Sequence, residues 1–199
     1  MVSEHSRDRL DRRKVVAQLL AERGDALVVS GLGSSTYDVH AAGDVDANYY
    51  LWGAMGGAAL VGLGIALAQP SKRLLVITGD GEQLMALGGL ATIAVARPKN
   101  LDIIVLDNES FGETGMQASH TASGVDLAAV AAAAGFAATG IASTIDDVAR
   151  LASELQQRCE GPRLFVIKLK ADSPPRSMPN RDAVFVKNRF RSYLGLGPC

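Results

Sequence analysis

The sequence predicts an α/β fold in which a parallel sheet is flanked by helices on both faces. Short, continuously apolar runs rich in β-branched residues alternate along the chain with longer segments of helical periodicity. Strands that are apolar at every position are typical of a parallel sheet covered by helices on both sides. Of the 199 residues, 48% are hydrophobic and 21% are charged, which suits one soluble domain with a sizeable core.

Five apolar runs are expected to form the strands of this sheet. The run 26–30 is the first, and the longer runs 74–78 and 101–107 follow it. A short strand is expected at 136–141, and the run 163–170 closes the core. Each run is short enough to be a single buried strand.

Helical patterns fill the intervals between these strands. Asp126 and Thr144 are expected N-caps, and Gly135 is an expected C-cap, because these residue types favour those positions. The expected helices cover residues 7–22, 56–69, 82–96, 126–135 and 144–158.

The small-residue helix 56–69 contains four glycines, which weaken a helix and therefore suggest a packing requirement. We expect this helix to pack closely and to lie near a subunit interface. Residues 1–170 are expected to form the domain. Residues 171–199 are expected to be a tail of the same domain, starting as a proline-broken loop and ending in a basic amphipathic helix from about Asp182.

Composition argues against several classes of function. A formal net charge of −1 gives no electrostatic footprint for nucleic acid or an anionic membrane. The first 16 residues are too polar for a secretory signal, and the apolar stretch 55–68 is too short and glycine-rich to span a bilayer. Cys159 and Cys199 form no CxxC pair, which disfavours a zinc or iron–sulfur site and fits a reducing cytoplasm.

Two polar loops follow predicted strands and attract attention as a binding site. Asp80, in Gly-Asp-Gly, follows the strand 74–78, and Asn108 follows the strand 101–107. The gap of 28 positions (108 − 80) accommodates one crossover helix and a strand, so both side chains can emerge at the same sheet edge. Carboxylate and amide oxygens suit Mg²⁺, and Gly79 and Gly81 would let the backbone approach a phosphate. The sequence therefore predicts a magnesium ion that holds a diphosphate.

These motifs resemble those of thiamine diphosphate enzymes. The run GDGEQLMALGGLATIA (79–94) and the run LDNESFGETG (106–115) look closest to the separate diphosphate-binding subunits of sulfopyruvate and phosphonopyruvate decarboxylases. The resemblance covers roughly residues 26–170 and implies the thiamine diphosphate-binding fold, with thiamine diphosphate and Mg²⁺ as cofactors.

The resemblance implies roles for individual residues. Asp80 and Asn108 would give side-chain oxygens to Mg²⁺, and Ser110 would give its backbone carbonyl. In the segment LWGAMGGAALVGLGIALA, Met55 would be the apolar wedge that bends the cofactor, and Gly53 would offer a carbonyl to the aminopyrimidine. The full set of expected cofactor-binding residues is Ser34, Ser35, Gly53, Met55, Gly79, Asp80, Gly81, Glu82, Asn108, Ser110, Phe111 and Gly112.

The sequence departs from the family pattern at three positions. The paired asparagines of the family are Asp107-Asn108 here, and the aromatic residue that follows is Phe111 where tyrosine is frequent. Glu82 stands where small residues are common, and its carboxylate would repel a diphosphate unless it pointed away. His120 lies in a loop that could overhang the substrate, although a solvent-exposed histidine is the simpler interpretation.

Other interpretations of these motifs remain open. Ser34 and Ser35 could serve a turn or helix cap as readily as a phosphate. The run GLGSST (31–36) partly matches a dinucleotide fingerprint, but its third glycine is missing and no clean helix is expected after it.

The chain lacks one group that the resemblance requires. Thiamine catalysis needs a glutamate on the pyrimidine ring, and no segment resembles the pyrimidine-binding domain that carries it. We therefore expect a partner (alpha) subunit to supply the glutamate across a homo- or hetero-oligomer interface. The expected reaction is non-oxidative decarboxylation of a small 2-oxo acid to CO₂ and an aldehyde. The alternatives are a carboligase or oxidoreductase subunit, or a non-catalytic regulatory subunit of the same fold.

Overall fold

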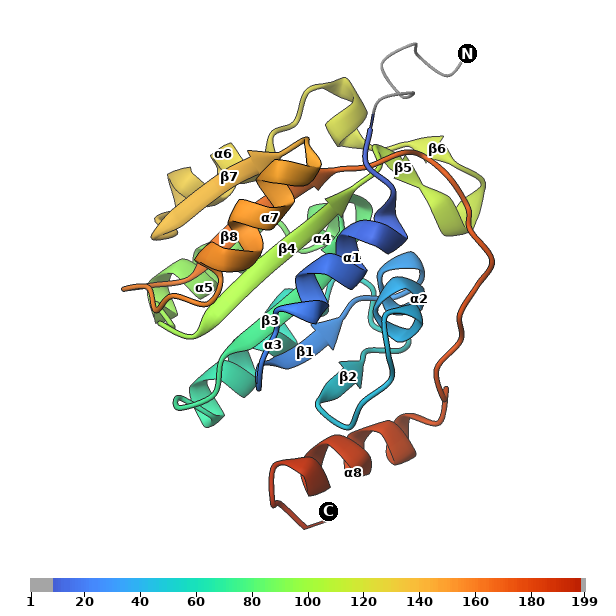
Figure 1. The fold of residues 1–199 in the computed structure, drawn as a ribbon. Helices are drawn as coiled ribbons and strands as arrows, with labels where there is room; N and C mark the ends of the chain where they lie inside the picture. The colour runs from blue at the N-terminus through green and yellow to red at the C-terminus, as the bar shows by residue number, and fades with distance from the viewer. Residues whose placement is uncertain (1–8, 198–199) are drawn as a thin grey trace.

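A six-stranded, fully parallel sheet forms the centre of the computed structural model, which describes residues 9–197 (Figure 1). The strand order is β2-β1-β3-β4-β8-β7, so the fold class predicted from sequence is confirmed. A small antiparallel hairpin, β5 with β6, follows β4. The strands are β1 (Leu27–Ser30), β2 (Asn48–Tyr50), β3 (Leu74–Gly79), β4 (Leu101–Asp107), β5 (Ser110–Phe111), β6 (Gln117–Ala118), β7 (Ala138–Ala142) and β8 (Arg163–Lys168).

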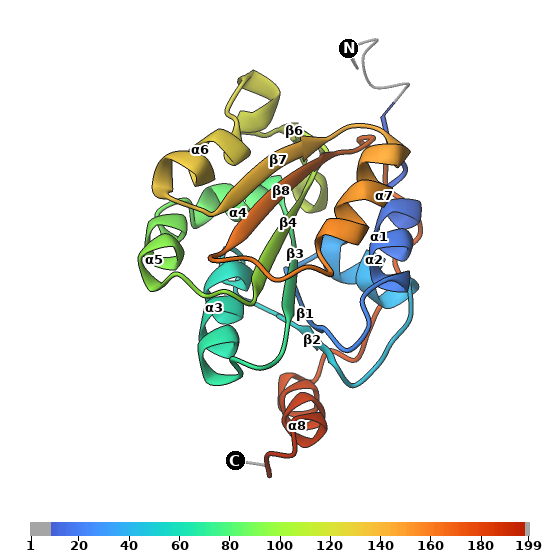
Figure 2. The same ribbon diagram turned by 60° about the vertical axis from the view of Figure 1, so that its left-hand side comes forward.

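Helices cover both faces of the sheet, and each face has its own apolar core (Figure 2). One core packs α3 (Ala58–Ala68), α5 (Gly89–Ala96) and α6 (Leu127–Ala134) on the sheet. The other packs α1 (Arg12–Ala21) and α7 (Ile145–Glu154). The remaining helices are α2 (Ser34–Ala41), α4 (Asp80–Met85) and α8 (Ala183–Tyr193), with 3₁₀ turns at Gly112–Thr114 and His120–Ser123.

The predicted helix caps are confirmed. The Asp126 side chain accepts the amide proton of Ala129 at the start of α6, and Gly135 ends that helix in the left-handed conformation. Thr144 caps α7 in a capping box with Asp147. These local signals fixed the ends of both helices because each satisfies backbone groups that the helix leaves unpaired.

Two helix predictions were wrong. The segment 82–96 is broken into α4 and α5 around Gly88 and Gly89, where paired glycines weaken helix continuity. No clean helix was expected with GLGSST, yet α2 begins within this run, at Ser34. Its polar residues are buried and hydrogen-bonded, as when the Thr36 hydroxyl donates to the Gly31 carbonyl, so it shows no apolar periodicity. Strands β2, β5 and β6 were missed because each has only two or three residues.

The C-terminal tail closes the β2 edge of the sheet. As predicted, residues 171–182 contain no helix or strand, and α8 begins after Asp182, whose side chain accepts the amide protons of Val184 and Phe185. Phe190 packs in one core and Val186 in the other, so α8 contributes to both faces. No helix within residues 9–197 is both long and apolar enough to cross a bilayer. Cys159 carries a free thiol, and Cys199 lies outside the described residues.

Glu82, in α4, links β3 and the loop after β1 with the loop that precedes α3. It is buried, and its carboxylate accepts the Thr78 hydroxyl at 2.9 Å and the Gly56 amide at 3.3 Å. Burial raises the pKa of Glu82, while Thr78 and nearby backbone amides oppose that shift. A Cβ on Gly31 would lie 1.6 Å from Glu82 Oε2, so the carboxylate occupies space that only glycine leaves open. Glu82 therefore acts as a strut inside this edge of the molecule.

The glycines of α3 do not all pack against other parts of this chain. A Cβ on Gly62 would lie 2.4 Å from Val76 Cγ2, so this glycine lets α3 approach β3. A Cβ on Gly64 would meet nothing within 4 Å, and that face of the helix is exposed. The expectation of close packing is confirmed at Gly62, whereas Gly64 packs against nothing within the described part of this chain. A subunit interface at this helix stays a prediction.

These two glycines give a matched pair of substitutions. Gly62→Ala should lower the free energy of unfolding by about 1–3 kcal/mol, because the added methyl overpacks a stiff β-branched neighbour. Gly64→Ala should raise it by about 0.5–1 kcal/mol through helix propensity alone. Urea denaturation measures both, and equal effects of the two substitutions would contradict the packing assigned to Gly62.

Removing the Glu82 carboxylate should destabilise the fold. Glu82→Ala should lower the free energy of unfolding by about 3 kcal/mol, because at least two buried donors lose their acceptor at about 1–3 kcal/mol each. Glu22, an exposed residue at the end of α1, provides the control, and Glu22→Ala should change stability by less than about 0.5 kcal/mol. A melting temperature of Glu82→Ala equal to that of the wild type would show that the strut is dispensable.

Candidate functional site

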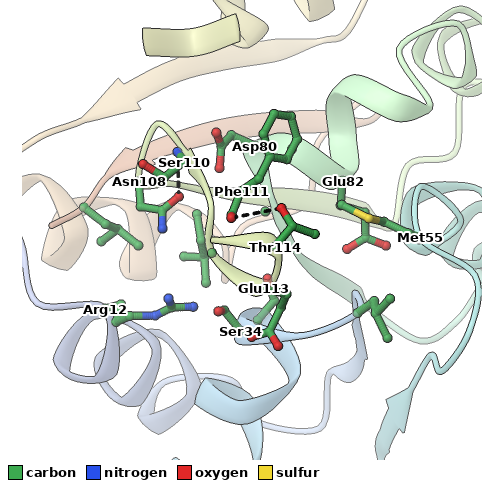
Figure 3. Close-up of a pocket in the computed structure, with 17 residues that line it drawn as sticks. Arg12, Ser34, Met55, Asp80, Glu82, Asn108, Ser110, Phe111, Glu113 and Thr114 are labelled. Carbon is green, nitrogen blue, oxygen red and sulfur yellow. Dashed lines mark hydrogen bonds between the residues drawn. The ribbon is translucent and has the colours of Figure 1, made fainter. Parts of the chain in front are cut away.

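The candidate site lies at the carboxyl ends of three adjacent strands, β1, β3 and β4. The chain leaves β1 toward one sheet edge and β3 toward the other, which is where open parallel sheets bind ligands. A cavity of about 110 Å³ opens there. Figure 3 shows side chains from the loops after these strands pointing into one space. Of the residues expected to bind the cofactor, all but Gly53 line this cavity.

Asp80 is the buried carboxylate of this cavity. Only 2% of its surface is exposed, and Oδ2 accepts hydrogen bonds from the hydroxyls of Ser119 and Thr121. Burial raises the pKa of Asp80 to about 6, with the Asp107 carboxylate adding to the rise and the two hydroxyls opposing it. None of the salt bridges within residues 9–197 involves Asp80. Within the described residues, the charge of Asp80 is therefore held by hydroxyl groups and the Gly81 amide, without a cation.

Asp107, one of the residues that depart from the family pattern, differs from Asp80 because it has a cationic partner. Its Oδ2 accepts a hydrogen bond from Lys168 Nζ at 2.6 Å, and its Oδ1 accepts one from the Thr121 hydroxyl at 2.8 Å. The Asp107 carboxylate, followed by that of Glu109, raises the pKa of Lys168 despite its partial burial. The aspartate is thus neutralised inside the protein, and Thr121 links it to Asp80.

Two successive side-chain turns shape the loop after β4. Asp107 Oδ1 accepts the amide proton of Glu109 at 3.0 Å, and Asn108 Oδ1 accepts that of Ser110 at 3.1 Å. Between them Glu109 adopts a φ of 58°, a left-handed conformation that is uncommon outside glycine. The chain reverses sharply as a result, and Asn108 and Ser110 both face the cavity.

The donor set fits a magnesium ion bound together with a diphosphate. Asp80, Asn108 and Ser110 line one cavity and offer a carboxylate, an amide oxygen and a backbone carbonyl, all hard oxygen ligands. Asn108 Oδ1 keeps a second lone pair although it already accepts the Ser110 amide proton. No group of three His, Cys, Asp or Glu side chains suited to a metal occurs within residues 9–197. A metal here would thus be held by one carboxylate, that of Asp80, together with neutral oxygens and the diphosphate.

The apolar wall of the cavity comes from Phe111 and Met55. A Cβ on Gly81 would lie 2.5 Å from Phe111 Cε1, so the glycine makes room for the phenyl ring. Met55 is 43% exposed although it is large and apolar, and it lines the cavity. Gly53 has a φ of 73° and lies outside the cavity lining, so its expected carbonyl contact stays a prediction.

The serines after β1 occupy the opposite wall. Ser34 and Ser35 are the first residues of α2, and both line the cavity. Gly33, the N-cap of α2, has a φ of 77°. A Cβ on Gly33 would lie 2.9 Å from Glu113 Cγ, so the loop packs under the segment that follows β5. The two serines are therefore placed as helix-terminal residues facing the same space as Asp80.

His120 does not join this group. Its side chain is exposed and does not line the cavity, so a substrate contact stays a prediction. Its neighbours Ser119 and Thr121 point inward to Asp80 and were missed by sequence reasoning, as were Lys168 and Arg12. No spacing rule in the sequence signals the partners that they contact, because only the fold brings these residues together.

Comparison with known proteins supports the resemblance. Residues 32–169 match the family model described as thiamine pyrophosphate enzyme, C-terminal TPP binding domain. The chain is 39% identical over 191 residues to phosphonopyruvate decarboxylase of Streptomyces viridochromogenes, covering 94% of this chain and 47% of that protein. It is 33% identical over 181 residues to sulfopyruvate decarboxylase subunit beta of Methanothermobacter thermautotrophicus, covering 91% and 94%.

The fold has known counterparts as well. Benzoylformate decarboxylase from Polynucleobacter necessarius superposes with a TM-score of 0.72 at 18% identity, covering 88% of this chain and 36% of that one. The chain spans about half the length of the phosphonopyruvate decarboxylases it matches. The matched segment contains every residue of the cavity except Arg12. The chain belongs to the thiamine pyrophosphate enzyme family and contains its C-terminal, cofactor-binding domain.

Proposed function

We propose that this chain is the diphosphate-binding subunit of a thiamine diphosphate-dependent decarboxylase that acts on a small 2-oxo acid. Asp80 carries the proposal, because it is buried at the cavity and no cationic side chain within residues 9–197 forms a salt bridge with it. The neighbouring Asp107 has Lys168 as its counterion, which makes the contrast specific. Mg²⁺ bound by Asp80, Asn108 and the carbonyl of Ser110 would supply the missing positive charge.

The other residues of the cavity bind and orient the cofactor in this proposal. Thiamine diphosphate, when bound, supplies the carbanion chemistry of decarboxylation. Ser34 and Ser35 donate hydroxyl hydrogen bonds to phosphate oxygens near the N-terminus of α2, where a negative charge is favoured. Met55 and Phe111 exclude water and support the two rings of the cofactor, and Met55 is the wedge between those rings. Gly53 presents its carbonyl to the aminopyrimidine.

The activating acid comes from outside this chain in our proposal. Both glutamates that line the cavity are already engaged: Glu82 by Thr78 and Gly56, and Glu113 by Arg176 at 2.9 Å. Relatives named as subunit beta of sulfopyruvate decarboxylase support a two-subunit arrangement. A partner with the pyrimidine-binding domain would place its glutamate across the interface, in a homo- or hetero-oligomer.

The relatives also support the reaction and the class of substrate. Proteins named phosphonopyruvate and sulfopyruvate decarboxylase act on 2-oxo acids that carry a second anionic group, and we extend this class to the present chain. CO₂ and an aldehyde are the expected products. We also propose that residues 1–170 form the cofactor-binding domain, that 171–199 belong to it through α8, and that the protein is cytoplasmic.

Turnover by the assembled enzyme tests this function. The chain, mixed with a co-expressed subunit that carries the pyrimidine-binding domain, should release CO₂ from sulfopyruvate or phosphonopyruvate in the presence of thiamine diphosphate and Mg²⁺. Asp80→Ala should reduce this rate by more than about 100-fold, because a metal ligand and its charge are lost. The exposed Asp146, in the first turn of α7, provides the control, and Asp146→Ala should leave the rate unchanged.

Two results would contradict the proposal. CO₂ release by Asp80→Ala at the wild-type rate would show that Asp80 is not a metal ligand. CO₂ release only with an external electron acceptor, yielding an oxidised acyl product, would assign the chain to an oxidoreductase, and formation of a 2-hydroxyketone with a second aldehyde would assign it to a carboligase.

A further inference from the structure

One buried cation of the cavity has no role in the function proposed so far. Arg12 lines the cavity together with Ser34, Asn108 and Ser110, and only 4% of it is exposed. Its Nε donates to Asp38 Oδ2 at 2.6 Å. The hydrogen bonds within residues 9–197 include none from its two terminal nitrogens, and Figure 3 shows the guanidinium directed toward Ser34. Four strong donors of a buried side chain thus remain available to a ligand.

The charges around Arg12 leave a surplus positive charge at this place. Asp38 is 1% exposed, and it is shared by two arginines, since Arg13 Nε also donates to its Oδ1 at 2.6 Å. Arg176 and Lys168, the other cations near the cavity, have Glu113 and Asp107 as their own partners. The side chains that line the cavity include three carboxylates and, among the described residues, Arg12 as the sole cation.

Helix stability does not explain a buried arginine here. Arg12 is the first residue of α1, where the helix dipole disfavours positive charge. Removing a guanidinium from water is costly unless every donor finds a partner, and the terminal nitrogens of Arg12 have none in the described chain. A buried cation at a helix N-terminus breaks a local rule of helix stability, and its place at a cavity points to a ligand that accepts its hydrogen bonds.

We propose that Arg12 is an anion anchor for the diphosphate of the cofactor, with Asp38 as its positioning residue. Asp38 fixes the guanidinium through Nε, so the terminal nitrogens face the cavity and donate to phosphate oxygens. The anchor lies across the cavity from Asp80, so one end of the diphosphate would be held by the metal and the other by Arg12. This inference rests on the proposed function, and Arg12 itself lies outside the matched family segment.

Binding of Mg²⁺ and inorganic pyrophosphate to the purified chain tests the anchor without turnover. Arg12→Gln should weaken pyrophosphate in titration calorimetry by roughly ten- to hundredfold, the loss expected for charge-assisted hydrogen bonds. Arg12→Lys should fall between Arg12→Gln and the wild type, because it keeps the charge paired with Asp38 and loses the fork. If Arg12→Gln fails to fold, the pyrophosphate affinity of Arg12→Lys tests the anchor in its place.

Arg13 provides the matched control. It shares Asp38 with Arg12, but it is partly exposed and does not line this cavity. Arg13→Gln should change the pyrophosphate affinity by less than about fivefold, because the Arg13 side chain does not line the cavity and so cannot contact the ligand. A merely structural ion pair would lower the melting temperature of both glutamine variants and leave pyrophosphate affinity unchanged in both.

The outcomes separate the inference from the proposed function. Wild-type affinity in Arg12→Gln and Arg12→Lys would overturn the anchor, and an increased KM for the 2-oxo acid in those variants would then assign the guanidinium to the substrate anion. Failure of the wild-type chain to bind either pyrophosphate or thiamine diphosphate would contradict the diphosphate site itself.

Discussion

The burial of one carboxylate, Asp80, is the constraint on which the rest of the site depends. The side chain lies at the end of a central strand and is almost wholly removed from water, so its charge must be balanced inside the protein. Hydroxyls of Ser119 and Thr121 satisfy its hydrogen bonding without neutralising it. The loop after β4, the 3₁₀ turn at His120–Ser123 and the end of β3 are all arranged around this unbalanced charge.

Two carboxylates of the cavity lining, Asp80 and Glu82, form no salt bridge within residues 9–197, and Glu82 is engaged by Thr78 and Gly56. Lys168 balances Asp107, and Arg176 balances Glu113, whereas two arginines share Asp38. A dication next to Asp80 and an anion next to Arg12 would together complete the cavity. A magnesium diphosphate group has this charge pattern, which explains why a chain with a formal net charge of −1 can bind a strongly anionic cofactor without a basic surface.

Sequence predicted the scaffold better than the details of the site. Uniformly apolar runs predicted five strands, and caps such as Asp126 and Thr144 predicted helix ends, because both signals are local. Helix α2 was missed because buried hydrogen bonds replace its apolar face. The substitution at Asp107 could be noticed in the sequence, but its counterion Lys168 lies 61 residues away and is brought near only by pairing of β4 with β8. Arg12 was missed for the same reason, since only the fold brings α1 to the cavity.

In our proposal this chain binds the diphosphate end of thiamine diphosphate, and a partner subunit supplies the acid that activates the cofactor. The most direct measurement is the rate at which the C2 proton of thiamine diphosphate exchanges with solvent deuterium when the cofactor is bound to the chain with Mg²⁺. We expect the chain alone to bind the cofactor but to leave the exchange rate of its C2 proton equal to that of free cofactor. Adding the pyrimidine-binding partner should greatly accelerate this exchange. Accelerated exchange in the chain alone would contradict the account, because this chain would then supply its own activating acid.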